Sequence, residues 1–229
     1  MAQGLAGQAG GTAERGLWLG PESRAAHRAD LATFVDNAIR LDDAAVIRLR
    51  ARSAGLLTAW VATGFEVLAS RVVAGKLRPD DLSVGANELA RGLSAMDASG
   101  YVDPGFAMDS AWRGALPPES GFTHLDDVPA PVLLDLAQQG ARLAKEHSSS
   151  HGPPVSLLDQ EVIQVSSNEV SVGLPMRCVF ALTAMGFLPQ SPEDADEIIR
   201  VRITPAWLRI DARFGSVYRR RGHPALVLR

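Results

Sequence analysis

Apolar and polar residues alternate most clearly between residues 160 and 188. Two short strands are predicted there, because alternate apolar residues share one face of each. These residues are Ile163 and Val165 in the first strand, and Val170, Val172 and Leu174 in the second. Pro175 suits the first position of a helix. The apolar spacing of Cys178, Ala181, Leu182 and Met185 then predicts a helix that ends at Gly186.

A similar pattern occurs between residues 45 and 75. Residues 45–50 and 56–61 alternate as two strands around a turn, and Thr63-Gly64-Phe65-Glu66 has the form of a capping box. The apolar residues that follow predict a helix from Phe65 to Gly75. Further helices are predicted before each hairpin, over residues 31–40 with Asp30 as N-cap, and over residues 132–146. The chain therefore contains two predicted α-β-β-α units, of duplicated or of independent origin.

The rest of the chain completes an α+β prediction with antiparallel hairpins covered by helices. A turn over residues 78–81, a strand over 82–84 and a helix over 86–96 follow the first unit. Strands are predicted over residues 198–204, 206–212 and 216–220, with an edge strand over 225–228. Short turns join these strands, which favours an antiparallel C-terminal sheet over a parallel one.

Domain boundaries follow from composition. Residues 1–29 are rich in Gly and Ala and poor in large apolar groups, which predicts a disordered tail. Residues 30–229 are predicted to form one compact domain, with similar halves at 30–96 and 129–229. The stretch 97–128 lacks periodicity, so it is interpreted as a belt joining the halves or as a loop packed over a groove.

Charge and cysteine content narrow the classes of function. The formal net charge of the 229 residues is −3. Residues 200–229 contain eight arginines and one acidic residue, a charge of +7, which leaves −10 for residues 1–199. Cys178 is the only cysteine, which excludes an intramolecular disulfide and favours a reducing compartment. No apolar run is long enough to span a membrane and no secretory signal is recognised, so a cytoplasmic location without a membrane partner is predicted.

The C-terminal strands predict an anion-binding surface. Alternation turns Ile199, Val201 and Ile203 inward and leaves arginines on the opposite face, where planar guanidinium groups suit phosphate or carboxylate. The residues of this predicted site are Arg200, Arg202, Trp207, Arg209 and Arg213, with Arg219, Arg220 and Arg221 just beyond. We therefore expect a non-enzymatic binding protein whose partner is RNA, DNA, an acidic protein or a second copy of the chain. The alternative is an ordinary solvated face, neutralised by Asp211 or by the acidic residues 193–197.

An enzyme is the second hypothesis, with its site on the aperiodic stretch. Its candidate residues are Trp112, Arg113, His124, Asp126 and Asp127, since a histidine beside carboxylates can do acid–base work. Asp126 or Asp127 is equally well explained as a cap of the following helix. No nucleophile elbow, phosphate loop or zincin motif is present. His147 and His151 have metal-ligand spacing but lack a third ligand, so neither a metal nor a cofactor is predicted.

Three segments resemble an uncharacterised protein family of high-GC Gram-positive (actinobacterial) bacteria. They are Trp112-Arg113-Gly114-Ala115-Leu116-Pro117-Pro118, Leu125-Asp126-Asp127-Val128-Pro129 and Asp211-Ala212-Arg213-Phe214-Gly215-Ser216-Val217-Tyr218-Arg219-Arg220. The resemblance spans most of the chain after residue 30. It implies no activity, cofactor or catalytic residue.

Overall fold

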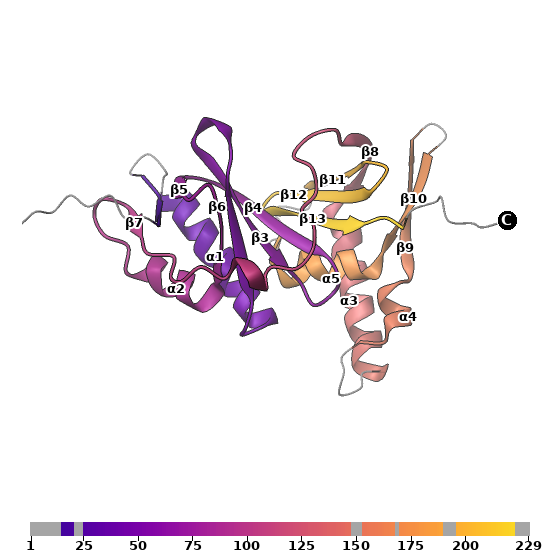
Figure 1. The fold of residues 1–229 in the computed structure, drawn as a ribbon. Coiled ribbons are helices and arrows are strands. Elements are labelled where there is room, and N and C mark those ends of the chain that lie inside the picture. Colours follow the sequence, from indigo (N-terminus) through magenta and orange to yellow (C-terminus); the bar gives the residue numbers. More distant parts are fainter. Residues whose placement is uncertain (1–14, 21–24, 148–152, 168–169, 190–195, 223–229) are drawn as a thin grey trace, which may run out of the picture.

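An antiparallel sheet of eight strands forms the centre of the computed structural model, which describes residues 15–20, 25–147, 153–167, 170–189 and 196–222 (Figure 1). All of its neighbouring strands are antiparallel. In spatial order the strands are β6 (Asp81–Gly85), β2 (Val46–Ala51), β3 (Leu56–Ala62), β4 (Leu68–Ala74), β13 (Gly215–Arg220), β12 (Trp207–Ala212), β11 (Ile198–Ile203) and β8 (Thr123–Pro129). The α+β prediction with an antiparallel C-terminal sheet is confirmed.

The strand order is symmetric about the β4–β13 pair, in which Ala69 lies opposite Val217. In the first half, the meander β2-β3-β4 is flanked by β6. In the second half, the meander β13-β12-β11 is flanked by β8. Helix α1 (Ala25–Leu41) precedes the first meander and α5 (Met176–Ala184) the second, while β6 leads into α2 (Ala86–Ser94) and β8 into α3 (Ala130–His147). The two halves thus share an arrangement, although its unit differs from the predicted α-β-β-α.

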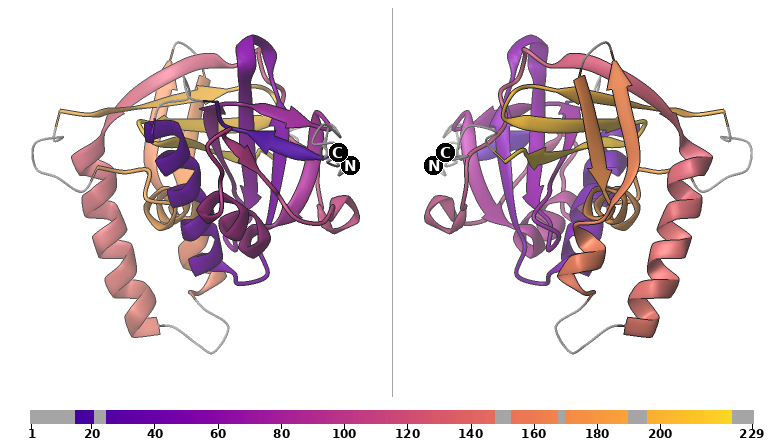
Figure 2. Two further views of the ribbon diagram at one scale, coloured as in Figure 1. Left: turned by 90° about the vertical axis from the view of Figure 1, so that its left-hand side faces the viewer. Right: turned by 90° about the vertical axis from the view of Figure 1, so that its right-hand side faces the viewer.

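The helices cover one face of this sheet and form the main core with it (Figure 2). Leu31 and Phe34 on α1 are buried, and the ring of Phe34 stacks on that of Phe187 with centroids 6.3 Å apart. On α5, Cys178 and Leu182 are buried as the apolar spacing predicts. Each buried Leu or Phe side chain among these contributes about 1.5–3 kcal/mol to stability by its burial. Among the described helices, none has both the length and the apolar character needed to cross a membrane.

Two smaller sheets flank the central one. Strands β1 (Gly16–Trp18), β5 (Lys76–Arg78) and β7 (Tyr101–Val102) form a three-stranded sheet, and β9 (Glu161–Ser167) pairs with β10 (Val170–Pro175). Short helices α4 (Val155–Leu158), η1 (Ser53–Gly55) and η2 (Asp109–Ala111) complete the described structure. The predicted hairpin and helix between residues 160 and 188 are confirmed, and Gly186 has a left-handed φ of 66°.

The predicted helix from Phe65 to Gly75 is wrong, because residues 68–74 form strand β4. The Thr63 hydroxyl does not cap a helix. It donates a hydrogen bond to the Val67 carbonyl oxygen at 2.7 Å and thereby closes the β3–β4 turn. Glu66 adopts a left-handed φ of 57° in this turn. The apparent capping box is therefore a tight turn between two strands.

Three further expectations need correction. Asp30 lies inside α1, which begins at Ala25, and pairs with Arg71. Part of the expected tail is ordered, because β1 and the start of α1 fall within residues 1–29 and Leu17 is fully buried. The aperiodic stretch 97–128 contains β7 and most of β8. The rest of the expected tail and the edge strand predicted over residues 225–228 lie outside the described residues.

Candidate anion-binding cleft

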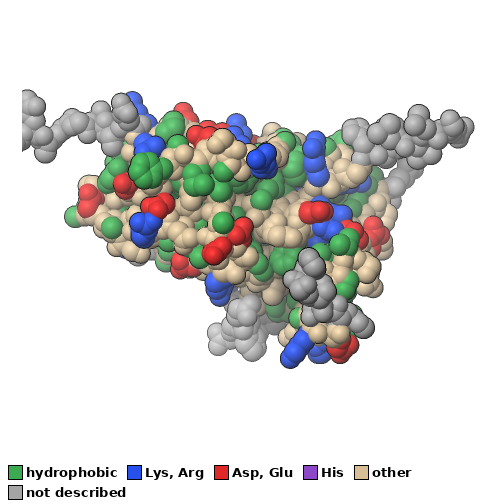
Figure 3. Space-filling view, turned by 60° about the horizontal axis from the view of Figure 1, so that its bottom comes forward, with side chains coloured by type: hydrophobic (Ala, Val, Ile, Leu, Met, Phe, Trp, Pro, Cys, Tyr) green, Lys and Arg blue, Asp and Glu red, His purple; other side chains and the backbone are tan. Residues whose placement is uncertain are grey.

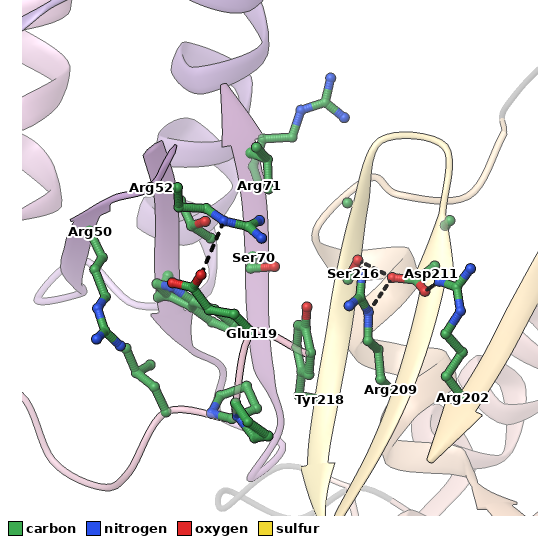
Figure 4. Close-up of a pocket in the computed structure, with 18 of the residues that line it drawn as sticks. Arg50, Arg52, Ser70, Arg71, Glu119, Arg202, Arg209, Asp211, Ser216 and Tyr218 are labelled. Atoms are coloured by element: carbon green, nitrogen blue, oxygen red, sulfur yellow. Dashed lines mark hydrogen bonds and ion pairs between the residues drawn. The ribbon is translucent and has the colours of Figure 1, made fainter. Parts of the chain in front are cut away.

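A cleft of about 430 Å³ lies on the sheet face that the helices leave open. Strands β3, β4 and β13 form its floor, with β11 and β12 at one end and β2 and the β2–β3 connection at the other (Figure 4). Its lining includes six arginines and two acidic residues, a formal charge of +4. The arginines are Arg50, Arg52, Arg71, Arg202, Arg209 and Arg213, and the acidic residues are Glu119 and Asp211.

Asp211 organises the end of the cleft formed by the second half of the chain. Its side chain is 14% exposed and pairs with Arg202 and, at 2.7 Å, with Nε of Arg209. The Ser216 hydroxyl donates a further hydrogen bond of 2.5 Å to Asp211. One carboxylate therefore orients two guanidinium groups, and each keeps further N–H donors.

Arg50 and Arg52 stand at the opposite end, in the first half of the chain. The Arg50 side chain is 46% exposed, and its Nε lies 3.9 Å from Asp81. Nε of Arg52 lies 3.8 Å from Glu119. Figure 4 shows Arg50 and Arg52 on one side, and Arg202 and Arg209 on the other. Arg71 lines the cleft as well, but its guanidinium pairs with Asp30 of α1.

A cluster of aromatic residues lies under the cleft. Trp60, Trp207 and Tyr218 are each 6–7% exposed, and the rings of Trp60 and Tyr218 are 5.0 Å apart. Burial raises the pKa of the Tyr218 hydroxyl. The Arg209 guanidinium lies 5.5 Å from the ring centroids of both Tyr218 and Phe122. These contacts hold Arg209 by cation–π attraction as well as by its ion pair.

The segment 112–122, here called the strap, runs along the cleft from the side of β2 to the start of β8. Trp112, Leu116 and Phe122 pack against the aromatic cluster, and Glu119 reaches Arg52. The aperiodic stretch thus both joins the two halves and packs beside a groove, so each interpretation of it captures part of its role.

The structure brings together three residues of the predicted arginine face, Arg202, Arg209 and Arg213. Arg200 is exposed and lines a neighbouring pocket with Arg213. Trp207 lies on the expected face but is buried, with the Arg220 guanidinium 5.9 Å from its ring centroid. Trp207 therefore offers no open stacking surface.

Arg219 does not join this face. It follows Val217 by two positions on β13, so it points to the helix-covered side, where it pairs with Asp159 at 3.2 Å. Arg221 donates a hydrogen bond to the Thr204 carbonyl oxygen at 3.0 Å. The prediction that Arg219 continues the face is wrong.

Sequence reasoning missed Arg50, Arg52 and Arg71 as members of this cleft. A signal for Arg50 was present, because the alternation of residues 46–51 turns Arg48 and Arg50 away from Ile47 and Leu49. No local signal places these strands beside the C-terminal ones.

The five candidate residues of the enzyme hypothesis do not converge. His124 and Asp127 on β8 form a pair at 2.8 Å, with both side chains about half exposed. Trp112 lies near β2, where its ring is 5.8 Å from the Arg48 guanidinium. Five strands separate β2 from β8, a distance on the order of 30 Å. Arg113 is exposed, and Asp126 accepts a hydrogen bond from the Asp127 amide.

No group of three or more His, Cys, Asp or Glu residues suited to a metal occurs among the described residues. The side chains of His147 and His151 lie outside the described part of the chain. Cys178 is fully buried, and desolvation raises the pKa of its thiol to about 12. Cys178 is thus a core residue.

Two family models match the chain, one in each half. Residues 12–114 match DUF8010 and residues 117–224 match DUF8185, both described as domains of unknown function. The division falls within the strap region, so it separates the same two halves that the strand order relates. A search of curated proteins found no significant match.

Solved structures with a similar fold include bacterial DNA polymerase sliding clamps. The clamp of Bacillus subtilis aligns with a TM-score of 0.56 at 11% identity, over 93% of this chain and 66% of that chain. A putative DNA polymerase III β subunit from Eubacterium rectale gives 0.55 at 13% identity, with the same coverage. The Bartonella birtlesii clamp bound to griselimycin gives 0.51 at 10% identity, over 84% and 63%. This chain thus spans slightly under two thirds of the length of these clamps, and the likeness is one of fold.

Proposed function

We propose that this protein is a non-enzymatic, cytoplasmic interaction protein that binds an anionic partner in the cleft. The observation that carries the proposal is the charge of the cleft. Its lining has a formal charge of +4 in a chain of net charge −3, so all other residues together carry −7. A concave site with one sign of charge concentrates its field and selects ligands of the opposite sign.

The ion pairs around the cleft reduce this charge but do not cancel it. Asp30 of α1 neutralises Arg71, whereas Asp211 is shared by Arg202 and Arg209. Glu119 and Asp81 approach Arg52 and Arg50 only at 3.8 Å and 3.9 Å. A guanidinium group has five N–H donors, of which one ion pair uses at most two. The remaining donors favour bidentate contacts with carboxylate or phosphate.

Nucleic acid and acidic protein are both candidate partners. DNA association is favoured by the clamp-like fold, since the similar structures are subunits of DNA polymerase. At 10–13% sequence identity, the similarity to the clamps concerns the fold alone. Anion binding is therefore supported by the charge of the cleft and not by this similarity. Membership of an actinobacterial family stays a prediction.

The proposal is tested with fluorescent poly-L-glutamate and a labelled single-stranded oligonucleotide, by anisotropy at low ionic strength. At least one probe is expected to bind, with an affinity that falls as salt rises. Arg50→Glu combined with Arg213→Glu is expected to weaken binding by about tenfold or more. Arg142→Glu, an exposed charge reversal on α3, is the matched control. Absence of binding by both probes at low salt would show the proposal to be wrong.

A further inference from the structure

We infer that the cleft takes an extended acidic segment of a partner protein, which crosses the strands and contacts arginines at both ends of the cleft. This inference rests on the proposed function and adds to it the class of partner and the spacing of its charges. Three observations favour a protein segment over nucleic acid, and one sets the spacing.

The first observation is the charge around the cleft. Acidic residues lie near the two ends of the cleft. Asp81 on β6 is 3.9 Å from Nε of Arg50, and Asp109 on η2 accepts a hydrogen bond from the Ser83 amide of β6. Asp127 lies on β8, the strand next to β11. Double-stranded DNA carries a negative charge about every 1.7 Å along its axis. Asp81 is paired with Arg48 and Asp127 with His124, so a polymer that extended beyond the cleft would meet ion pairs there and no continuous positive track. A short acidic segment places its charges only where the arginines of the cleft are.

The second observation is the absence of open stacking rings in the described part of the cleft. Trp60, Trp207 and Tyr218 are 6–7% exposed, and Phe122 lies under Arg209. Proteins that bind single strands commonly stack bases on exposed aromatic rings, each stack contributing about 1–3 kcal/mol. Buried rings cannot contribute in this way, and an acidic peptide does not need them.

The third observation concerns the other side of the molecule. Figure 3, turned toward the helix-covered side, shows basic, acidic and apolar side chains intermixed among the described residues. No continuous basic surface is visible on the described part of that face. The described part of that face therefore offers no extended basic surface to a DNA duplex. The positive charge that a ligand could use is concentrated in the cleft.

The spacing follows from the sheet. Arg50 is on β2 and Arg209 on β12, and the order β2-β3-β4-β13-β12 puts four strand intervals between them. Four intervals of about 4.8 Å give a separation on the order of 19 Å between their backbones. An extended peptide advances about 3.3 Å per residue, so about six residues span this distance.

The floor between the two ends is polar. Thr58, Ser70 and Ser216 line it between the arginine groups, and Figure 4 shows Ser70 and Tyr218 between them. Thr58 and Ser70 are only 3–4% exposed, and the Ser216 hydroxyl already donates to Asp211, so the floor adds few open hydrogen-bonding groups. The cleft thus offers its positive charge mainly at its two ends.

The test compares two fluorescent 12-residue peptides of identical composition. Each carries two Glu-Asp pairs, separated by six positions in one peptide and adjacent in the other. A 12-mer oligothymidylate is the nucleic-acid probe. The widely spaced peptide is expected to bind about tenfold more tightly than the compact one, because it alone engages both arginine groups. Arg50→Glu and Arg213→Glu, both at exposed positions, should each remove this preference, while Arg142→Glu leaves it unchanged.

Each other outcome counts against the inference in a distinct way. Equal affinity for the two peptides would overturn the spanning geometry. Binding of oligothymidylate but of neither peptide would overturn the inference and leave the proposed function standing, whereas no binding of any probe would end both. Concentration-dependent self-association that Arg50→Glu abolishes would assign the cleft to a second copy of the chain. Circular dichroism of each variant confirms that the fold is retained.

Discussion

Asp211 is the residue on which the arrangement of the cleft depends. It accepts hydrogen bonds from Arg202, Arg209 and Ser216, and its carboxylate lowers the charge that a ligand meets. Asp211→Asn is expected to lower the free energy of unfolding by about 2 kcal/mol, because charged hydrogen bonds are lost. The same change raises the charge of the lining from +4 to +5, so binding of poly-L-glutamate should tighten. Urea denaturation and anisotropy measure the two effects.

Asp36→Asn, an exposed change on α1, is the control for this variant. A folded Asp211→Asn protein with unchanged or weaker anion binding would contradict the role given to Asp211. The pairing itself could be predicted from the sequence, because alternation puts Asp211 and the arginines on one face. The orientation of Arg219 was harder to predict, since Val217 and Tyr218 are both buried and conceal the alternation of β13.

Cys178 gives a prediction about reactivity and pH. Burial raises its pKa to about 12, against the opposing effect of Arg219 and Arg177. At pH 8 only about one thiol in 10,000 is then ionised, compared with about a quarter for a free cysteine of pKa 8.5. Iodoacetamide at pH 8 is expected to leave the native protein unmodified and to alkylate it in urea. Mass spectrometry of both samples provides the measurement and its control.

The same shift links Cys178 to stability at high pH. The thiol of the unfolded chain ionises near pH 8.5, whereas the buried thiol resists ionisation up to about pH 12. Ionisation thus favours the unfolded chain above pH 8.5. The neutral buried thiol makes its full contribution to the free energy of unfolding below pH 8.5. This contribution declines as the pH rises toward 12. Alkylation of the native protein at the rate of the unfolded one would contradict this account.

At the scale of elements, β4 shows why one prediction failed. Residues 65–75 carry apolar side chains at spacings that fit both a helix and a strand, and a capping-box sequence precedes them. The choice is made by pairing, because Ser70 lies opposite both Trp60 of β3 and Ser216 of β13. The β13 partner is about 150 positions away, so local pattern could not reveal it. The hairpins β2–β3 and β9–β10, whose strands are neighbours in sequence, were predicted correctly. The neighbouring β3–β4 hairpin was missed because its turn has the form of a capping box.

Helix α5 is fixed to the first half of the chain by Arg177. This side chain is 4% exposed and donates to Asp159, to Glu66 and to the Phe65 carbonyl oxygen. Asp159→Ala leaves a buried cation with one exposed counter-charge, Glu66. The free energy of unfolding of this variant is expected to be about 2–3 kcal/mol lower than that of the unchanged protein. This loss is smaller than is usual for a broken buried ion pair, because the Asp159 side chain is half exposed.

Adding Arg177→Met to Asp159→Ala is expected to recover part of this loss, because the unpaired buried charge is removed. Urea denaturation of the two single variants and the double variant measures the recovery. Asp135→Ala on α3, an exposed residue bonded to Gln139, is the control for loss of a surface carboxylate. A double variant whose loss is the sum of the single losses would show that the two residues act independently.

For the whole molecule, the order of the eight strands is the feature that the sequence could not predict. Similar halves were expected from hairpin patterns, but their union through β4 and β13 joins residues about 150 positions apart. The cleft lies across this union, with Arg50 and Arg52 from one half and Arg202 and Arg209 from the other. The arginines of the second half could therefore be predicted from the sequence, because they lie on one face of strands that are neighbours in sequence. The arginines of the first half could not be assigned to the same site.

The union of the halves leads to a last prediction, about cutting the chain at the strap. Arg113, Gly114 and Ala115 are exposed, and the two matched family models meet at this point. A protease site inserted between Gly114 and Ala115 should therefore be cleaved in the folded protein.

After cleavage the two pieces are expected to elute together in size-exclusion chromatography. The β4–β13 pairing, the Phe34–Phe187 stack and the Phe65–Phe180 contact all cross between the halves, so the core holds without the covalent link. Uncleaved protein is the control. Pieces that separate under native conditions would show that the halves are independent domains, and a site shared between them would then require the intact strap.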